Sequence, residues 1–190
     1  MLRRCRHEKE TFSEIPYLED GRIVLRKLEP EDADGLRELV NSPAVYRYLP
    51  TFLFEKKYED VTEVIRRLYG ECFEESMILG IFADRDFCGL IEMYGYDEPD
   101  RKVSIGARLL ERSWGKGAAT GAVRLLLGYL RGETDIVTVT ASSMIDNRCS
   151  AHVLEKCGFT LTAREDEDWG FGRPTPADKW ICRWSAEEEM

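Results

Sequence analysis

The chain has 190 residues and a mass of 21.9 kDa, which suffices for one well-buried core and is too short for two comfortable domains. Its 27 Lys and Arg against 36 Asp and Glu give a net charge of −9, which argues against nucleic acid binding and favours a cationic substrate or basic partner. With 43% hydrophobic and 33% charged residues the chain is typical of a globular protein, and we expect one domain over residues 1–190, with an N-terminal extension over 1–20 and a core over about 21–185.

The first half of the chain is predicted to begin with an antiparallel pattern. Ile23 and Leu25 alternate with polar residues before Pro30, as in a strand. Apolar residues then recur at helical spacing in two segments, and two apolar runs flank the turn sequence ADRD. The expected elements are a strand over residues 21–28, helices over 31–40 and 58–69, and a hairpin with strands over 77–83 and 87–94.

The second half is predicted to alternate strands and helices. Gly158 is expected to end a short helix in the left-handed conformation, with Phe159 behind it as a hydrophobic contact. Gly121 and Gly128 fall within a longer helix, where they are expected to permit close packing. The expected elements are strands over residues 103–110 and 136–141, helices from about 118 onward and over 148–157, and strands over 159–164 and 179–184. Together they predict a mixed α/β domain.

The segment ERSWGKGAATG, residues 111–121, places two glycines between a predicted strand and a predicted helix. Glycine permits a tight turn, and the start of a helix offers unpaired N–H groups and a positive dipole end, so an anion such as phosphate is expected there. The letters do not match a P-loop, which needs GxxxxGK followed by Ser or Thr. They match the dinucleotide fingerprint poorly, because Gly121 comes one residue late and Asp135 precedes the next strand. A dinucleotide-dependent dehydrogenase is therefore the weaker alternative.

Two blocks of sequence resemble the GCN5-related N-acetyltransferase (GNAT) superfamily. Arg112-x-x-Gly115-x-Gly117 is similar to its (Q/R)-x-x-G-x-(G/A) signature, whose loop holds the pyrophosphate of acetyl-CoA. Downstream, NRCS and then EKCGF resemble the N-x-x-S and E-K-x-G-F segments of the same superfamily. Within it, SIGARLLERSWGKGAAT is most similar to the branch of ribosomal-protein and small-amine acetylases. The resemblance is carried by residues 103–159, extends over 21–161, and implies a mostly antiparallel mixed sheet flanked by helices.

The resemblance implies how acetyl-CoA is held as co-substrate. Two central strands would splay apart, and the pantetheine arm would insert between them at Leu109 and Leu110. Backbone N–H groups of residues 114–119 would hold the pyrophosphate, Asn147 would bond the arm, and Ser150 would face the thioester sulfur. From the residues alone, Asn147 is equally expected as a helix N-cap and Ser150 as a residue of the first helical turn. The other residues expected at the cofactor are Arg112, Trp114, Gly115, Lys116, Gly117, Ala118, Ala119 and Thr120.

Acetyl transfer to a primary amine needs a group that removes the amine proton and stabilisation of the leaving thiolate. Members of the family often carry a Glu for the first task, but Ser104 stands at that position here. Many place a Tyr for the second task where this chain has Leu154. We expect Glu92 on a neighbouring strand to act as the base, with Glu111 as the other candidate. Ser150, or no acid at all, would serve the thiolate.

The acceptor amine is left open by the sequence. Both a basic protein N-terminus and a small cationic amine, such as a polyamine or an antibiotic, fit the acidic charge balance. Residues 164–178 combine five acids with Trp169 and Phe171, and we expect a loop that covers a cationic amine or is simply a solvated hairpin loop. The alternative to an enzyme is a non-catalytic acetyl-CoA-binding sensor.

The compartment and assembly are predicted from what the sequence lacks. The six cysteines form no CxxC pair and no zinc-type spacing with the two histidines, so we expect free thiols and no metal site. No apolar segment follows the basic start MLRRCRHEKE, and no stretch approaches the roughly 20 apolar residues of a membrane helix. We expect a cytoplasmic protein without a membrane or nucleic acid partner, either a monomer or a homodimer.

Overall fold

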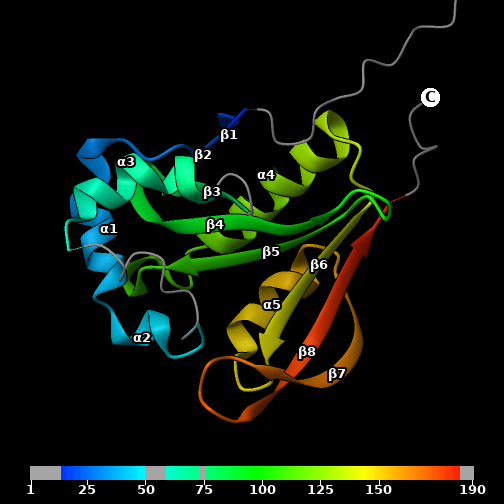
Figure 1. The fold of residues 1–190 in the computed structure, drawn as a ribbon. Coiled ribbons are helices and arrows are strands. Elements are labelled where there is room, and N and C mark those ends of the chain that lie inside the picture. The colour runs from blue at the N-terminus through cyan, green and yellow to red at the C-terminus, as the bar shows by residue number, and fades with distance from the viewer. Residues whose placement is uncertain (1–13, 50–58, 73–75, 185–190) are drawn as a thin grey trace, which may run out of the picture.

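The computed structural model describes residues 14–49, 59–72 and 76–184. These residues form a sheet of eight strands in the order β1-β2-β3-β4-β5-β6-β8-β7 (Figure 1). Every neighbouring pair is antiparallel except β5 and β6, which are parallel. The strands are β1 (Leu18–Asp20), β2 (Ile23–Arg26), β3 (Ser76–Ala83), β4 (Asp86–Asp97), β5 (Lys102–Leu109), β6 (Thr138–Met144), β7 (Thr160–Asp168) and β8 (Pro174–Arg183). The predicted mixed, mostly antiparallel sheet is confirmed.

Five α-helices accompany this sheet among the described residues, and the two long helices after the β-hairpin begin at Ala118 and Arg148, as predicted. The helices are α1 (Ala33–Val40), α2 (Pro43–Tyr46), α3 (Val61–Cys72), α4 (Ala118–Glu133) and α5 (Arg148–Lys156). Short 3₁₀ turns occupy Pro30–Asp32 and Glu111–Ser113. The predicted start of the second helix, Tyr58, lies outside the described residues. Strand β1 and helix α2 were not predicted, since each is only three or four residues long.

The β3–β4 hairpin shows how local sequence directs the sheet. Its two-residue turn is Asp84-Arg85, and both residues have positive φ, at 53° and 76°. Turns of this kind follow the right-handed twist of the flanking strands, and Asp tolerates the left-handed conformation better than most residues. The hairpin predicted around ADRD is therefore confirmed, and it aligns β4 for pairing with β5.

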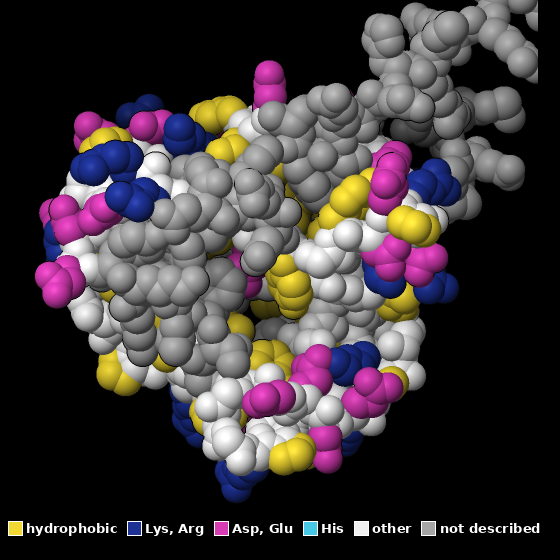
Figure 2. All heavy atoms as spheres, in the orientation of Figure 1, with side chains coloured by type: hydrophobic (Ala, Val, Ile, Leu, Met, Phe, Trp, Pro, Cys, Tyr) yellow, Lys and Arg dark blue, Asp and Glu magenta, His cyan; other side chains and the backbone are white. Residues whose placement is uncertain are grey.

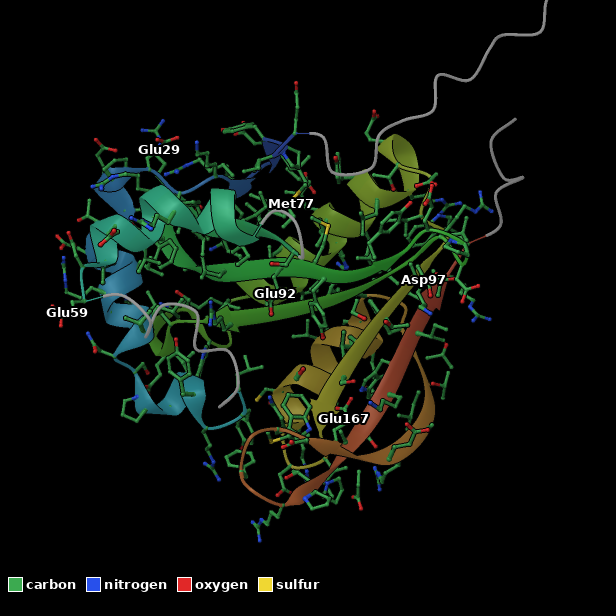
Figure 3. The ribbon with its side chains drawn as sticks, in the orientation of Figure 1. Glu29, Glu59, Met77, Glu92, Asp97 and Glu167 are labelled. Carbon is green, nitrogen blue, oxygen red and sulfur yellow. The ribbon has the colours of Figure 1, made fainter. Side chains whose placement is uncertain are left out.

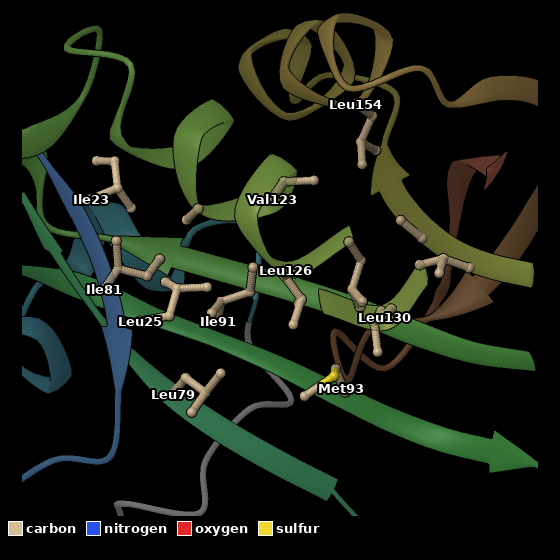
Figure 4. Packing of buried hydrophobic residues seen from close by; sticks show 14 of the residues in the cluster. Ile23, Leu25, Leu79, Ile81, Ile91, Met93, Val123, Leu126, Leu130 and Leu154 are labelled. Carbon is tan, nitrogen blue, oxygen red and sulfur yellow. The ribbon is translucent and has the colours of Figure 1, made fainter. Parts of the chain in front are cut away.

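The two faces of the sheet are covered differently. Residues Ile91 and Met93 point to the face on which α4 packs, together with Val123, Leu126 and other buried residues (Figure 4). The intervening Leu90 belongs to a second core formed with α1 and α3. This alternation follows from the two-residue period of a strand, so Leu90 and Glu92 face the α1 and α3 side.

Strands β5 and β6 separate after a short paired segment. Their pairing covers only Lys102–Ser104 against Thr138–Thr140, although β5 continues to Leu109 beside β4 and β6 continues to Met144 beside β8. A hydrogen bond of 2.8 Å joins the Ser104 and Thr140 hydroxyls at the last pair. Figure 1 shows the strands diverging from there. The centre of the sheet thus contains the opening that the family resemblance implied.

The backbone facing this opening can be identified from the paired end. The Thr138 N–H donates to the Arg101 carbonyl at 3.2 Å, which shows that Arg101 faces β6. Strand residues alternate in the side to which they direct their N–H and C=O groups. By that alternation Ile105, Ala107 and Leu109 present backbone groups to the opening.

Residues 164–178 are mostly strand, which corrects the prediction of a loop over this segment. Strand β7 runs to Asp168, β8 resumes at Pro174, and the connection between them is residues 169–173. Bidentate bonds of 2.7 and 3.1 Å from Arg164 to Asp178 tie the two strands together. The segment escaped prediction because nearly every residue of β7 is at least partly exposed, so no apolar alternation marks it.

Candidate functional site

The loop between β5 and α4 has the geometry of an anion cradle. Gly115 and Gly117 have φ values of 71° and 83°, a region that favours glycine. A Cβ built at either position would meet no heavy atom within 4 Å, so open space lies in front of the loop. Both glycines are therefore required by conformation, and the space that they leave is available to a ligand.

Unpaired backbone donors line the start of α4. The Gly121 N–H bonds the Gly117 carbonyl at 2.9 Å, which leaves the N–H groups of residues 118–120 without a partner inside the helix. The positive end of the helix dipole adds to their attraction for an anion. The run of N–H donors was predicted to begin at Trp114. The Trp114 N–H already bonds the Glu111 carbonyl at 3.0 Å, so the run begins after this residue. The remaining groups fit a pyrophosphate.

The Trp114 side chain connects this loop to the opening in the sheet. Its indole Nε1 donates to the Leu109 carbonyl at 2.8 Å, and Leu109 is the last residue of β5 to face the opening. Leu110 behaves differently from the expectation that it binds pantetheine through its backbone. Its N–H bonds the Cys88 carbonyl at 2.8 Å, its carbonyl accepts from the Ser113 N–H at 2.9 Å, and its side chain is buried.

The predicted basic residues lie beside the cradle. Arg112 and Lys116 line a surface pocket of about 270 Å³ at the start of α4, with Arg22, Asp84 and other residues. The Arg112 guanidinium also pairs with Glu38 of α1, at 3.2 Å from both carboxylate oxygens. Arg112 therefore anchors the loop to α1 as well as supplying charge near the anion site.

Helix α5 places the second predicted block at its own N-terminus. Asn147 is the N-cap, and its side chain accepts a hydrogen bond of 3.2 Å from the Ser150 N–H. The predicted capping role is thus confirmed. Ser150 lies half-buried in the first turn of the helix, which packs against α4. Thr120, Ala119 and Ala118 occupy the first turn of α4 itself.

Glu92 projects from β4 on the face not covered by α4. It lies opposite Gly106 of β5, where a Cβ would come within 2.9 Å of Glu92 Oε1, so the glycine makes room for the carboxylate. Glu92 and the buried Arg108 line a cavity of about 10 Å³, which is room for about one water molecule. Figure 2 shows a hollow on this side of the molecule with acidic and hydrophobic side chains at its edge.

The other carboxylate candidate lies in a different environment. Glu111 is exposed on the 3₁₀ turn after β5 and accepts a hydrogen bond of 3.2 Å from the Ser42 hydroxyl. Leu154, at the position where the family often has Tyr, is buried in the core with 5% exposure. Neither Glu111 nor Leu154 lines the cavity beside Glu92.

Tyr94 is a residue of this face that the sequence did not single out. Tyr94 keeps 40% of its surface exposed, but partial burial of its phenol, followed by the negative charges of Glu92 and Glu167, raises the pKa of Tyr94 to about 12. The phenol therefore stays protonated at neutral pH and can donate a hydrogen bond. Its position two residues after Glu92 on one strand was the signal available in the sequence, since such residues share a face.

A second charged group faces the same region from β6, β7 and β8. Glu167 Oε1 accepts hydrogen bonds from the Ser142 hydroxyl, at 3.2 Å, and from the Lys179 ammonium group. Lys179 also donates to the Ser142 hydroxyl at 3.3 Å. The sequence could not predict this group, because its three members are brought together by the strand order β6-β8-β7.

The described residues include no group of three or more His, Cys, Asp and Glu side chains arranged to hold a metal ion. None of the helices in these parts of the chain is long and apolar enough to cross a membrane. Cys88, Cys149, Cys157 and Cys182 are free thiols, as predicted.

Comparison with known proteins agrees with this geometry. Residues 22–160 match the acetyltransferase (GNAT) domain family. The chain is 30% identical over 143 residues to the putative ribosomal N-acetyltransferase YdaF of Bacillus subtilis (strain 168), covering 72% of this chain and 77% of that protein. It is 27% identical over 143 residues to spermidine N(1)-acetyltransferase of Escherichia coli (strain K12), covering 73% of each. The fold matches that of spermidine N-acetyltransferase from Vibrio cholerae in complex with CoA and spermine, with a TM-score of 0.70, 21% identity, and coverage of 86% and 96%.

Proposed function

Since this chain belongs to the GNAT acetyltransferase family and transfers acetyl from acetyl-CoA to an amine, we propose which residues hold the two substrates and that the acceptor is a cationic primary amine. One observation carries the proposal. The opening between β5 and β6 joins a loop of unpaired N–H groups to a hollow that contains Glu92. A thin, anionic substrate and a cationic substrate can therefore meet at the centre of the sheet.

On the donor side, acetyl-CoA supplies an activated acetyl thioester. The N–H groups of residues 115–120 hold its pyrophosphate, with charge from Arg112 and Lys116 and with the Thr120 hydroxyl beside them. The edge of β5 that ends at Leu109 binds the pantetheine arm, while Leu110 supports that edge from the core. Asn147 and Ser150 approach the arm from α5. Support comes from the open space at both loop glycines and from the incomplete pairing of β5 with β6.

On the acceptor side, Glu92 is the general base. It takes the proton of the acceptor ammonium, directly or through a water molecule in the adjoining cavity, so that the neutral amine nitrogen can form the new amide bond as the C–S bond breaks. The protonated Tyr94 donates a hydrogen bond within the same hollow. Ser150 stabilises the departing sulfur, which can also leave without full protonation.

The acceptor class and the compartment are further parts of the proposal. Two proteins similar to this chain carry the names ribosomal N-acetyltransferase and spermidine N(1)-acetyltransferase. A protein N-terminus and spermidine both present a cationic amine. The net charge of −9 and the carboxylates of the hollow favour such molecules. We place the protein in the cytoplasm, where thiols such as the four described ones stay reduced.

The test is release of CoA thiol from acetyl-CoA in the presence of amines. Purified protein is assayed with small monoamines, diamines and a basic peptide with a free N-terminus, and the products are identified by mass spectrometry. We expect saturable, amine-dependent thiol release and an increase of one acetyl group on the amine. Saturable binding of acetyl-CoA with no turnover of any amine would instead identify a sensor.

A further inference from the structure

We propose that Glu167 selects the acceptor by binding a second positive charge of a substrate whose reacting amine lies at Glu92. This inference rests on the proposed function and concerns the same hollow. It assigns a specificity role to the outermost strand, β7, and to the ion pair that this strand makes with β8.

The first argument is the face on which these groups lie. Glu92, Tyr94 and Ser104 share one face of β4 and β5, and the Ser104 hydroxyl bonds Thr140 of β6 on that face. Ser142 follows Thr140 by two residues and therefore points the same way, toward Lys179 and Glu167. Figure 3 labels Glu92 on β4 and Glu167 on β7, on either side of the opening.

The second argument is electrostatic contact across the opening. The negative charges of Glu92 and Glu167 both act on Tyr94, which lies on the strand of Glu92. The charge of Glu167 therefore acts on the region in front of β4, on the face that the two carboxylates share, although β5, β6 and β8 separate the two strands in the sheet. The two carboxylates therefore border one hollow.

The third argument is the bonding of Glu167. Both of its hydrogen bonds, from Ser142 and Lys179, go to Oε1, so Oε2 makes none to a residue within the described ranges. The carboxylate is held in one orientation with an oxygen left for a ligand. Counted together with the buried Arg108 guanidinium, the two carboxylates and the Lys179 ammonium group balance in charge, so a second cation on the acceptor would be bound by the Oε2 atom itself and not by a net charge of the hollow.

The other acids of this segment do not share these properties. Glu165, Asp166 and Asp168 are exposed to solvent, whereas Glu167 is half-buried. Asp178 is buried, but both of its oxygens are bonded by Arg164. Glu167 is thus distinguished by its environment and not by the abundance of acids around it.

The experiment compares α,ω-diamines with monoamines of the same chain length, using kcat/KM for acetyl-CoA-dependent thiol release. In Glu167→Gln we expect the diamine to monoamine ratio of kcat/KM to fall about tenfold or more, the usual effect of losing a charge-assisted hydrogen bond. In Lys179→Gln we expect the ratio to rise, because the competing ammonium group is removed. Asp166→Asn is the matched control, with an adjacent charge removed from an exposed position, and it leaves the ratio unchanged.

The opposite signs separate substrate selection from a merely structural ion pair. If the pair only stabilises the fold, both Glu167→Gln and Lys179→Gln lower thermal stability and shift the ratio in the same direction or not at all, and the inference is overturned. If the wild type releases thiol with none of the amines tested, the proposed function is refuted instead. In that case calorimetric titration of the CoA-loaded protein with a diamine still decides the role of Glu167, since weaker binding in Glu167→Gln supports it and equal binding rejects it.

Discussion

The position of Glu92 in the hollow depends on Gly106, the residue directly opposite it on β5. Any larger residue at position 106 would press its Cβ against the carboxylate, which lies 2.9 Å from that point. A carboxylate can therefore turn into the half-buried space beside Arg108 and meet an incoming ammonium group. The base that we propose for this chain lies on β4, the strand that pairs with the Ser104 strand β5.

Replacing Glu92 with Gln should lower kcat by about 10²- to 10⁴-fold, the usual contribution of a general base. Affinity for acetyl-CoA, measured by calorimetry, should stay the same because the residue lies on the acceptor side. Glu111→Gln is the matched control and should retain activity. Equal losses of kcat in the two variants would show that the effect is one of overall charge.

Tyr94 provides a direct readout of the electrostatics of the hollow. Ultraviolet titration of phenolate, taken as the difference between wild type and Tyr94→Phe, should give a midpoint near the pKa of about 12. Since this pKa lies above the ordinary tyrosine pKa of 10.0, the stability contributed by Tyr94 is complete below pH 10.0 and is lost as the pH rises toward 12. Glu92→Gln should lower the midpoint, and an ordinary midpoint in the wild type would show that partial burial and the two carboxylates do not act on this phenol.

Gly117 tests the cradle, because its φ of 83° is costly for any other residue. Gly117→Ala should cost about 1–2 kcal/mol of stability and, by changing the loop, weaken acetyl-CoA binding about tenfold or more. Gly128→Ala is the control on the same helix, where a Cβ meets no atom within 4 Å. The control should bind acetyl-CoA normally, and parallel losses in both variants would argue against a specific loop geometry.

Two glycines of helix α4, Gly121 and Gly128, have different surroundings. Gly121 and Gly128 are one heptad apart and were expected to serve close packing alike. A Cβ at Gly121 would approach Ile23 Cγ1 to 2.7 Å, whereas none of the described atoms lies within 4 Å of a Cβ at Gly128. The expectation is confirmed for Gly121 and wrong for Gly128. Spacing along a helix cannot reveal which glycine meets a strand.

Gly121→Ala should therefore destabilise the protein by about 1–3 kcal/mol through overpacking against β2. Gly128→Ala should stabilise it by up to about 1 kcal/mol, as expected for alanine in a helix. The free energies of unfolding come from denaturant titrations. Ile23→Ala removes Cγ1, so the loss caused by Gly121→Ala should be smaller in the Ile23→Ala background than in the wild type, and an equal loss in both backgrounds would place the strain elsewhere.

The elements that the sequence predicted are those with a local signal. The turn at ADRD, the glycines of the cradle and the cap at Asn147 depend on neighbours within a few residues. Residues 164–178 of the β7–β8 hairpin were mistaken for a loop, because β7 has polar residues on both faces. Glu167 and Tyr94 could not be connected, because their proximity depends on the order of strands across the whole sheet.

At the scale of the whole molecule, the core continues behind the opening. Ile91 and Val103 from one half of the sheet share a cluster of buried residues with Ile136, Leu154 and Trp180 from the other half. Helix α4, which packs on β1–β4, contributes buried residues to the same cluster (Figure 4). The two halves are thus joined by packing where their strands are not paired.

Chemical unfolding should accordingly be a single transition, as expected for one domain. Circular dichroism and tryptophan fluorescence in a Trp114→Phe variant, whose remaining tryptophans Trp169, Trp180 and Trp184 all lie in the second half, should give coincident curves. Acetyl-CoA at 100 times its Kd should raise the free energy of unfolding by about 2.7 kcal/mol. Separate transitions for the two probes would show instead that the halves are independent units.

The opening has a last consequence, for solubility. Unpaired strand edges normally invite the strands of other molecules and so promote aggregation. Here the unpaired backbone of residues 105–109 and 141–144 lies inside the sheet, between two halves that meet at Ser104 and Thr140. Such an edge can admit one slender chain from the wide end, but a neighbouring protein's sheet is too broad to enter. The protein thereby keeps exposed backbone groups at its centre without offering a template for self-association.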